Sequence, residues 1–141
     1  LNRDARDAAL ATSAHALTDI TGFGLAGHAR EMAEASGITI VLDIRNLPML
    51  PGTEDLSRAG HHSRATGSNR AFVEPVMRFQ GQPDPVREAF LFDAQTSGGL
   101  LISVAPDRAD ELVERCHADG LTAATKIGSV EMKQDASLVI R

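Results

Sequence analysis

The chain has 141 residues, of which 43% are hydrophobic and 23% charged, and its formal net charge is -5 at pH 7. These values fit one globular domain with a single core, and the acidic balance argues against nucleic acid or an anionic membrane as a partner. No apolar run approaches the roughly 20 residues that span a bilayer. The only cysteine, Cys116, cannot form an internal disulfide, so a cytoplasmic protein is expected.

The chain begins with leucine rather than methionine and enters a helical pattern at once, so we expect it to be a piece of a longer protein. Alanines at helical spacing, with no helix breaker, predict a first helix over residues 4–16. A second helix is predicted over residues 22–36, with Thr21 as its N-cap and Gly37 just beyond its C-terminus.

Alternating side chains at residues 38–44 predict a strand. Prolines and a glycine then interrupt the chain, and a short helix over residues 53–59 is predicted before a loop that runs to Asn69. Residues 71–79 are predicted to be extended. An Asp-Pro pair at Asp84 is typical of a helix start, and this helix is predicted to end near residue 92.

The last third of the chain predicts a buried strand over residues 100–105 and a helix over residues 107–119 that Gly120 ends. Two closing strands are predicted over residues 123–132 and 137–140. Helices and strands alternate without internal repeats. The pattern therefore predicts an α+β fold: one α/β sandwich in which helices pack on the faces of a mixed β-sheet.

One candidate site lies at the start of the second helix, where Asp19 precedes a turn formed by Thr21, Gly22 and Gly24. A carboxylate there can hold a hard cation such as Mg²⁺ while the N–H groups of the turn face phosphate oxygens. His28 follows one turn later and can donate to a phosphate. The alternative is structural: Asp19 and Thr21 cap the helix, and His28 is a satisfied, partly buried histidine.

A second candidate site is the run Thr96, Ser97, Gly98 and Gly99, which lies between a predicted helix end and a buried strand. Irregular polar backbone at such a position needs partners, and these can be an anion or the first turn. The alternative is a strand entry built from hydroxyls and glycines. The run is not a Walker loop, because no Gly-Lys-Ser or Gly-Lys-Thr follows. If the two turns share a ligand, they converge at one edge of the sheet.

Two weaker signals have structural explanations. A locally basic stretch can meet a triphosphate or an acidic partner, but it also fits a solvated loop. Its members are Arg58, His61, His62, Arg64 and Arg70. Cys116 falls on the predicted buried stripe of its helix, where cysteine acts as a small hydrophobe rather than a nucleophile.

Together, the run Thr-Gly-Phe-Gly-x-x-Gly-His at residues 21–28 and the run Gln-Thr-Ser-Gly-Gly-Leu-Leu at residues 95–101 resemble one family. It is the C-terminal half of the selenophosphate synthetases, also called selenide, water dikinases. The similarity extends over residues 15–141. It implies the fold of the C-terminal domain of the aminoimidazole-ribonucleotide-synthetase-like superfamily.

The resemblance also implies an activity: an ATP- and Mg²⁺-dependent homodimer that makes selenophosphate from selenide and water, releasing AMP and phosphate. Asp19 matches a metal-binding aspartate of the family. The residues that the resemblance expects at the nucleotide phosphates are Thr18, Thr21, Gly22, Gly24, His28, Thr96, Ser97, Gly98 and Gly99. The nucleophile, its lysine and the other metal-binding aspartates belong to an N-terminal half, so no catalytic residue is expected here and the chain alone is expected to be inactive.

The chain departs from the family pattern at two places. A Pro-Gly-Gly-Thr-like turn is expected where the sequence reads Ser63-Arg64-Ala65-Thr66, and Ala94 replaces the usual proline. Two other functions remain open. One is a non-catalytic binding or interaction module, which the absence of a Gly-rich, Asp- and Lys-containing half upstream in the gene would favour. The other is the equivalent domain of a different kinase or ligase of the superfamily, against which the loop at residues 96–99 argues.

Overall fold

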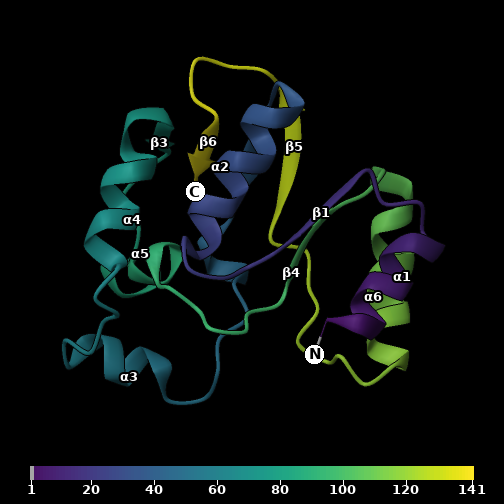
Figure 1. The fold of residues 1–141 in the computed structure, drawn as a ribbon, viewed down its shortest axis with the longest axis horizontal. Helices are drawn as coiled ribbons and strands as arrows, with labels where there is room; N and C mark the ends of the chain where they lie inside the picture. The colour runs from purple at the N-terminus through teal and green to yellow at the C-terminus, as the bar shows by residue number, and fades with distance from the viewer. Residues whose placement is uncertain (1) are drawn as a thin grey trace.

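A four-stranded mixed sheet forms the centre of the fold, which a computed structural model describes for residues 2–141. Its strands, in spatial order, are β3 (Met77–Phe79), β6 (Leu138–Ile140), β2 (Ile38–Leu42) and β5 (Gly128–Met132). β5 runs antiparallel to β2, whereas β6 is parallel to both of its neighbours. This mixed sheet, with helices packed beside it, confirms the predicted α+β fold (Figure 1).

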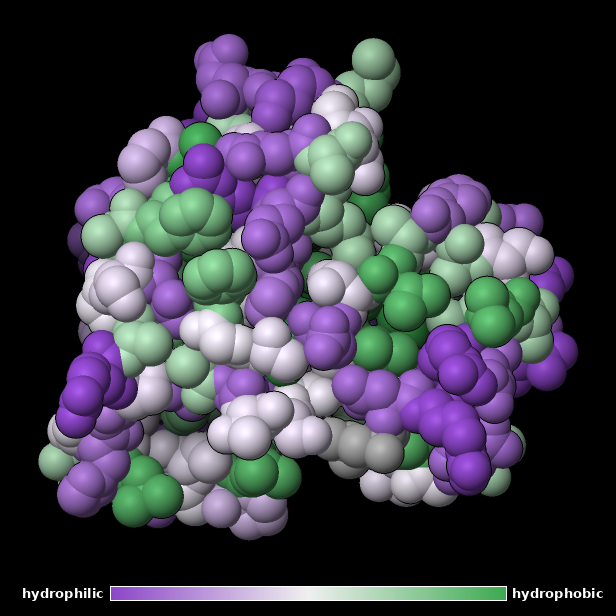
Figure 2. Space-filling model, in the orientation of Figure 1, coloured by the Kyte–Doolittle hydropathy of each residue, from purple (hydrophilic) through white to green (hydrophobic). Residues whose placement is uncertain are grey.

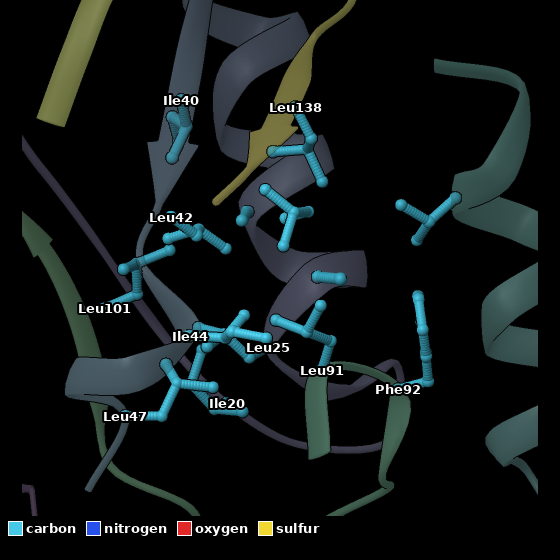
Figure 3. Packing of buried hydrophobic residues seen from close by; sticks show 14 of the residues in the cluster. Ile20, Leu25, Ile40, Leu42, Ile44, Leu47, Leu91, Phe92, Leu101 and Leu138 are labelled. Atoms are coloured by element: carbon cyan, nitrogen blue, oxygen red, sulfur yellow. The ribbon is translucent and has the colours of Figure 1, made fainter. Parts of the chain in front are cut away.

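The main core lies between this sheet and the central helix α2 (Gly24–Ser36), which packs on β2 and β6. Two further helices, α4 (Thr66–Val73) and α5 (Pro85–Phe92), pack against α2, and α3 (Thr53–Arg58) packs against α5. Figure 3 shows the apolar side chains that fill the space between them, including Leu42, Leu91 and Leu138. Buried apolar area of this kind is the main favourable term in folding.

A second unit lies beside the main core. β1 (Ala16–Asp19) and β4 (Leu100–Ser103) form a separate two-stranded antiparallel ribbon, which runs between the main core and the pair of helices α1 (Arg3–Ala11) and α6 (Ala109–Ala118) (Figure 1). α1 and α6 pack together around a smaller apolar cluster that includes Cys116. Burial raises the pKa of the Cys116 thiol, as expected for a cysteine used as a small hydrophobe.

Two predicted helix ends are confirmed by their geometry. Gly37 follows α2 in the left-handed region at φ 64°, and its N–H bonds the last turn of the helix. Asp84 caps α5, because its carboxylate accepts a hydrogen bond from the backbone N–H of Val86 at 2.8 Å. Within residues 2–141, no helix combines the length and apolarity needed to cross a membrane.

The first helix is shorter than predicted, and a strand follows it. α1 ends at Ala11 because Ser13 adopts a left-handed conformation at φ 57°, and the N–H groups of Ser13 and Ala14 close the last turn on the carbonyls of Leu10 and Ala9. The chain then enters β1, a strand that the sequence pattern did not predict and whose first residue was assigned to the helix. One mixed sheet was predicted. The structure has the four-stranded mixed sheet and, in addition, the separate β1–β4 ribbon.

The prediction that residues 71–79 are extended is wrong for most of that segment. α4 covers Thr66–Val73, the short 3₁₀ helix η2 follows at Glu74–Val76, and only β3 is extended. Thr, Gly and Ser open α4, and these residues have low helix propensity. The helix is stabilised by packing instead, because Val73 is fully buried in the main core.

β2 ends two residues before the predicted strand end because Asp43 begins the 3₁₀ helix η1 (Ile44–Asn46). The buried Asp43 carboxylate accepts hydrogen bonds from the backbone N–H and the guanidinium of Arg45. These bonds, more than any other cause, lower the pKa of Asp43 from its ordinary 3.8 to about 2.

The lowered pKa of Asp43 gives a pH-dependent stability with a defined sign. Charged Asp43 stabilises the fold fully above its unfolded pKa, and that contribution is lost as the pH falls from about 4 to about 2. Urea unfolding followed over this range should show wild-type stability falling more steeply than that of Asp43→Asn. The exposed Asp107→Asn serves as a control. A difference between wild type and Asp43→Asn that stays constant down to about pH 2 would contradict the assignment.

Candidate functional site

The β1–β4 ribbon brings the two candidate motifs together. Asp19 at the end of β1 is paired with Leu100 at the start of β4. Beyond this pair the backbone contact continues: Ile20 N–H donates to Gly99 O at 2.9 Å, and Gly98 N–H donates to Ile20 O at 3.1 Å. Gln95 N–H then donates to Thr21 O at 3.0 Å. The predicted convergence of the two turns is therefore confirmed.

Gly24 places the start of α2 against the end of α5. Its φ is 69°, and a Cβ at this position would lie 2.9 Å from Leu91 O, 2.9 Å from the carbonyl carbon of Phe92 and 3.0 Å from Asp93 O. Only glycine combines this conformation with such a close backbone approach. Gly22 is less constrained, because nothing lies within 4 Å of a Cβ built there.

Gly98 makes the equivalent close approach in the second motif. A Cβ there would lie 2.3 Å from Ile20 O and 2.6 Å from the Gln95 side-chain oxygen. Gly99 has open space at the same position. The two adjacent glycines therefore differ. The contact between the motifs requires glycine at position 98, whereas position 99 has room for a side chain.

Thr21 does not act as the predicted N-cap. Phe23 occupies the N-cap position of α2, and it makes no side-chain cap hydrogen bond. The Thr21 hydroxyl is instead 3.1 Å from Nε2 of His28, and Nδ1 of His28 is 3.1 Å from a carboxylate oxygen of Glu31. His28 is only 9% exposed. A hydroxyl, an imidazole and a carboxylate are therefore linked in one hydrogen-bonded chain at the start of α2.

The site that the two turns form has three exposed polar residues, which are Asp19, Thr96 and Ser97. Within residues 2–141, the backbone N–H groups of Thr96 and Ser97 donate to no protein acceptor, so they are available to an anion. Thr18 is placed differently. It precedes Asp19 on a strand, where successive side chains point to opposite faces, and its hydroxyl bonds the Asp19 carbonyl at 3.3 Å.

The site contains one carboxylate suited to a metal ion. Across residues 2–141, no three His, Cys, Asp or Glu side chains gather as a metal-binding group. Asp19 is exposed at the strand end. Mg²⁺ bound with a nucleotide commonly takes one or two protein carboxylates and completes its shell with water and phosphate oxygens. A single exposed carboxylate beside available N–H groups fits that arrangement.

Asn69 is a site-building residue that the sequence did not reveal. Its side-chain amide, in a residue that is 5% exposed, donates to Gly22 O at 2.8 Å and to Phe92 O at 3.0 Å. It therefore joins the first turn to the end of α5. No local sequence signal marks it, because its burial depends on α4, which was predicted as loop and extended chain.

The two departures from the family pattern meet in space. Ser63 Oγ accepts a hydrogen bond from the backbone N–H of Ala94 at 3.2 Å, and the Thr66 hydroxyl lies 3.0 Å from the same oxygen. Proline at position 94 has no N–H and could not make this bond. The 63–66 segment is therefore tied to the second motif by a contact that needs both departures.

Two members of the basic stretch are engaged within the domain. Arg58 pairs with Asp55 at 2.9 Å. Arg70 pairs with Glu88, and its guanidinium lies 4.9 Å from the centre of the Phe92 ring. These contacts favour the structural explanation of the stretch for Arg58 and Arg70.

The structure thus defines an α+β domain in which an antiparallel ribbon joins two glycine-containing turns into one exposed site. The chain belongs to the family described as AIR synthase related protein, C-terminal domain, whose model matches residues 1–141.

Curated relatives of the chain are named selenide, water dikinase, and they confirm the resemblance that the two motifs carry. The chain is 37% identical over 141 residues to the one from Caldanaerobacter subterraneus subsp. tengcongensis, covering 100% of this chain and 41% of the relative. It is 39% identical over 130 residues to that from Burkholderia ambifaria (92% and 37%), and 44% identical over 124 residues to that from Porphyromonas gingivalis (87% and 35%). The chain therefore spans about 40% of the length of these relatives.

The two adjacent glycines of the second motif offer a matched test of the backbone contact. Gly98→Ala forces a Cβ against Ile20 O, and overpacking of this kind should reduce the free energy of unfolding by about 1–3 kcal/mol. Gly99→Ala, which meets no atom within 4 Å, should change it far less. Urea denaturation of both variants measures the difference. Equal losses would show that the contact between the motifs is looser than described.

Asn69 should contribute to stability through the two carbonyls that it bonds. Asn69→Ala leaves the carbonyls of Gly22 and Phe92 without this donor, which should cost about 1–3 kcal/mol of unfolding free energy. Hydrogen exchange at the Gln95 and Gly98 amides should accelerate as the turns separate. Ser68→Ala on the exposed side of α4 is the control. Unchanged exchange at both amides would remove Asn69 from this bridging role.

Proposed function

We propose that the chain is the C-terminal part of an ATP- and Mg²⁺-dependent enzyme that makes selenophosphate from selenide, ATP and water, with AMP and phosphate as products. The observation that carries the proposal is the backbone pairing that sets Asp19 beside the turn at residues 96–99. It joins a carboxylate for a cation to N–H groups for an anion, which is the pairing that a magnesium nucleotide requires. The names of the relatives supply the reaction.

Each group has a distinct role in this proposal. Asp19 binds Mg²⁺, and the N–H groups of Thr96 and Ser97 bind phosphate oxygens. Gly24 and Gly98 allow the backbones to approach closely enough to form one site. When bound, Mg²⁺ would neutralise charge on the phosphates and hold them in a fixed orientation.

The proposal assigns the reacting groups to the rest of a longer protein. Cys116 is buried in the small cluster between α1 and α6. Lys126 pairs with Asp110 at 2.7 Å, and Lys133 donates to Ser137 at 2.8 Å. None of these side chains belongs to the two turns. We also propose that the longer protein has an N-terminal half, forms a homodimer and is located in the cytoplasm.

Asp19→Asn in the full-length enzyme tests the role of the carboxylate. The change keeps the size of the side chain but removes the charge that a hard cation needs. Selenide-dependent AMP formation should fall by roughly 100-fold or more, while the melting temperature should stay close to that of wild type, because Asp19 is exposed.

The matched control is Asp107→Asn, a change at an exposed aspartate outside both motifs. It should leave turnover and melting temperature unchanged. If Asp19→Asn retained wild-type turnover at an unchanged magnesium requirement, Asp19 would be a structural residue and the proposed cation site would be rejected.

A further inference from the structure

The chain of hydrogen bonds from Thr21 through His28 to Glu31 has a direction that chemistry determines. An ionised carboxylate can only accept hydrogen bonds, so the contact at 3.1 Å requires the proton on Nδ1 of His28. In the neutral imidazole the other nitrogen, Nε2, is then an acceptor. The Thr21 hydroxyl, 3.1 Å away, must therefore donate its hydrogen to Nε2.

This direction decides what Thr21 offers to a ligand. A hydroxyl whose hydrogen is committed to His28 presents oxygen lone pairs, which suit a cation. With the opposite tautomer, Nε2–H would donate to Thr21, and the hydroxyl hydrogen would be available to a phosphate oxygen. Thr21 follows Asp19 by two residues, and its carbonyl is bonded by Gln95 of the second motif.

We propose that Glu31 is a positioning residue which, acting through His28, makes Thr21 an oxygen donor to the cation held by Asp19 rather than a hydrogen-bond donor to phosphate. The proposal rests on the proposed function for the identity of the ligand. The direction of the hydrogen bonds follows from the two contacts and from the rule that a carboxylate only accepts, and it does not depend on the ligand. Phosphate binding is then left to the N–H groups of the second motif.

The side chain of His28 is packed inside the domain. His28 is 9% exposed, and the Phe23 ring lies against it with a centroid distance of 5.6 Å. Gly27 allows this packing, because a Cβ there would lie 2.5 Å from the Phe23 Cβ. Glu31 is exposed, and its side chain retains 52% of its accessible area, so replacing it should not disturb the core.

The tautomer of His28 can be observed directly by long-range ¹H–¹⁵N NMR of the 141-residue chain at about pH 8.5, above the ordinary titration range of histidine. Wild type should show the Nδ1–H form. Glu31→Ala should shift the ring toward the Nε2–H form, whereas Glu31→Gln, which keeps an acceptor oxygen, should retain Nδ1–H. Glu34→Ala, on the same helix and paired with Arg30, should have no effect.

If the contact between His28 and Glu31 had no role in positioning, Glu31→Ala would leave the tautomer of His28 unchanged. This result would overturn the proposal. An Nε2–H form in wild type would overturn it as well. Both outcomes are independent of ATP, selenide and Mg²⁺, so they do not depend on whether the proposed function is correct.

The consequence for the cation is measured in the full-length enzyme. Glu31→Ala should raise the Mg²⁺ concentration for half-maximal turnover about tenfold, whereas Glu34→Ala should not. Thr21→Val should raise it too, and adding Glu31→Ala to Thr21→Val should have little further effect, because Glu31 acts through the same hydroxyl. A loss of turnover in Glu31→Ala at an unchanged magnesium requirement would overturn the assignment to the cation. If Asp19→Asn leaves that requirement unchanged in the same assay, the proposed function fails instead.

Discussion

The arrangement of the site depends on one constraint: the antiparallel pairing of two backbone segments that are about 80 residues apart in the sequence. The pair Asp19 and Leu100 sets the register, and the hydrogen bonds of Ile20 continue it into both turns. Antiparallel pairing holds opposite residues with their Cα atoms about 4.5–5.5 Å apart. The backbone at Asp19 is therefore held next to the backbone that leads into the turn at residues 96–99.

The helix ends predicted correctly from sequence are encoded locally. Gly37 and Asp84 mark helix ends through their own backbone conformation or side chain, so a single position carries the signal. β1 is four residues long and is defined by its pairing with β4, which no local pattern records. α4 opens with poor helix formers and forms because it packs against α2 and α5.

The same distinction explains what could be predicted about the site. Both motifs were identified because hydroxyls and carboxylates beside glycines are recognisable in the sequence, and their convergence followed from the need to share a ligand. The partner of Thr21 was not predicted, because capping and bonding to His28 compete, and only packing decides between them. Asn69 was missed since its two acceptors come from different parts of the chain.

The contact between Ser63 and Ala94 has an evolutionary consequence. Each residue departs from the family pattern, yet the hydrogen bond between them exists only when both are present. Restoring proline at position 94 alone would leave the Ser63 hydroxyl without this donor, and restoring proline at position 63 alone would orphan the Ala94 amide. The two positions should therefore change together among relatives, so that grafting the 63–66 segment between family members succeeds only when residue 94 is exchanged with it.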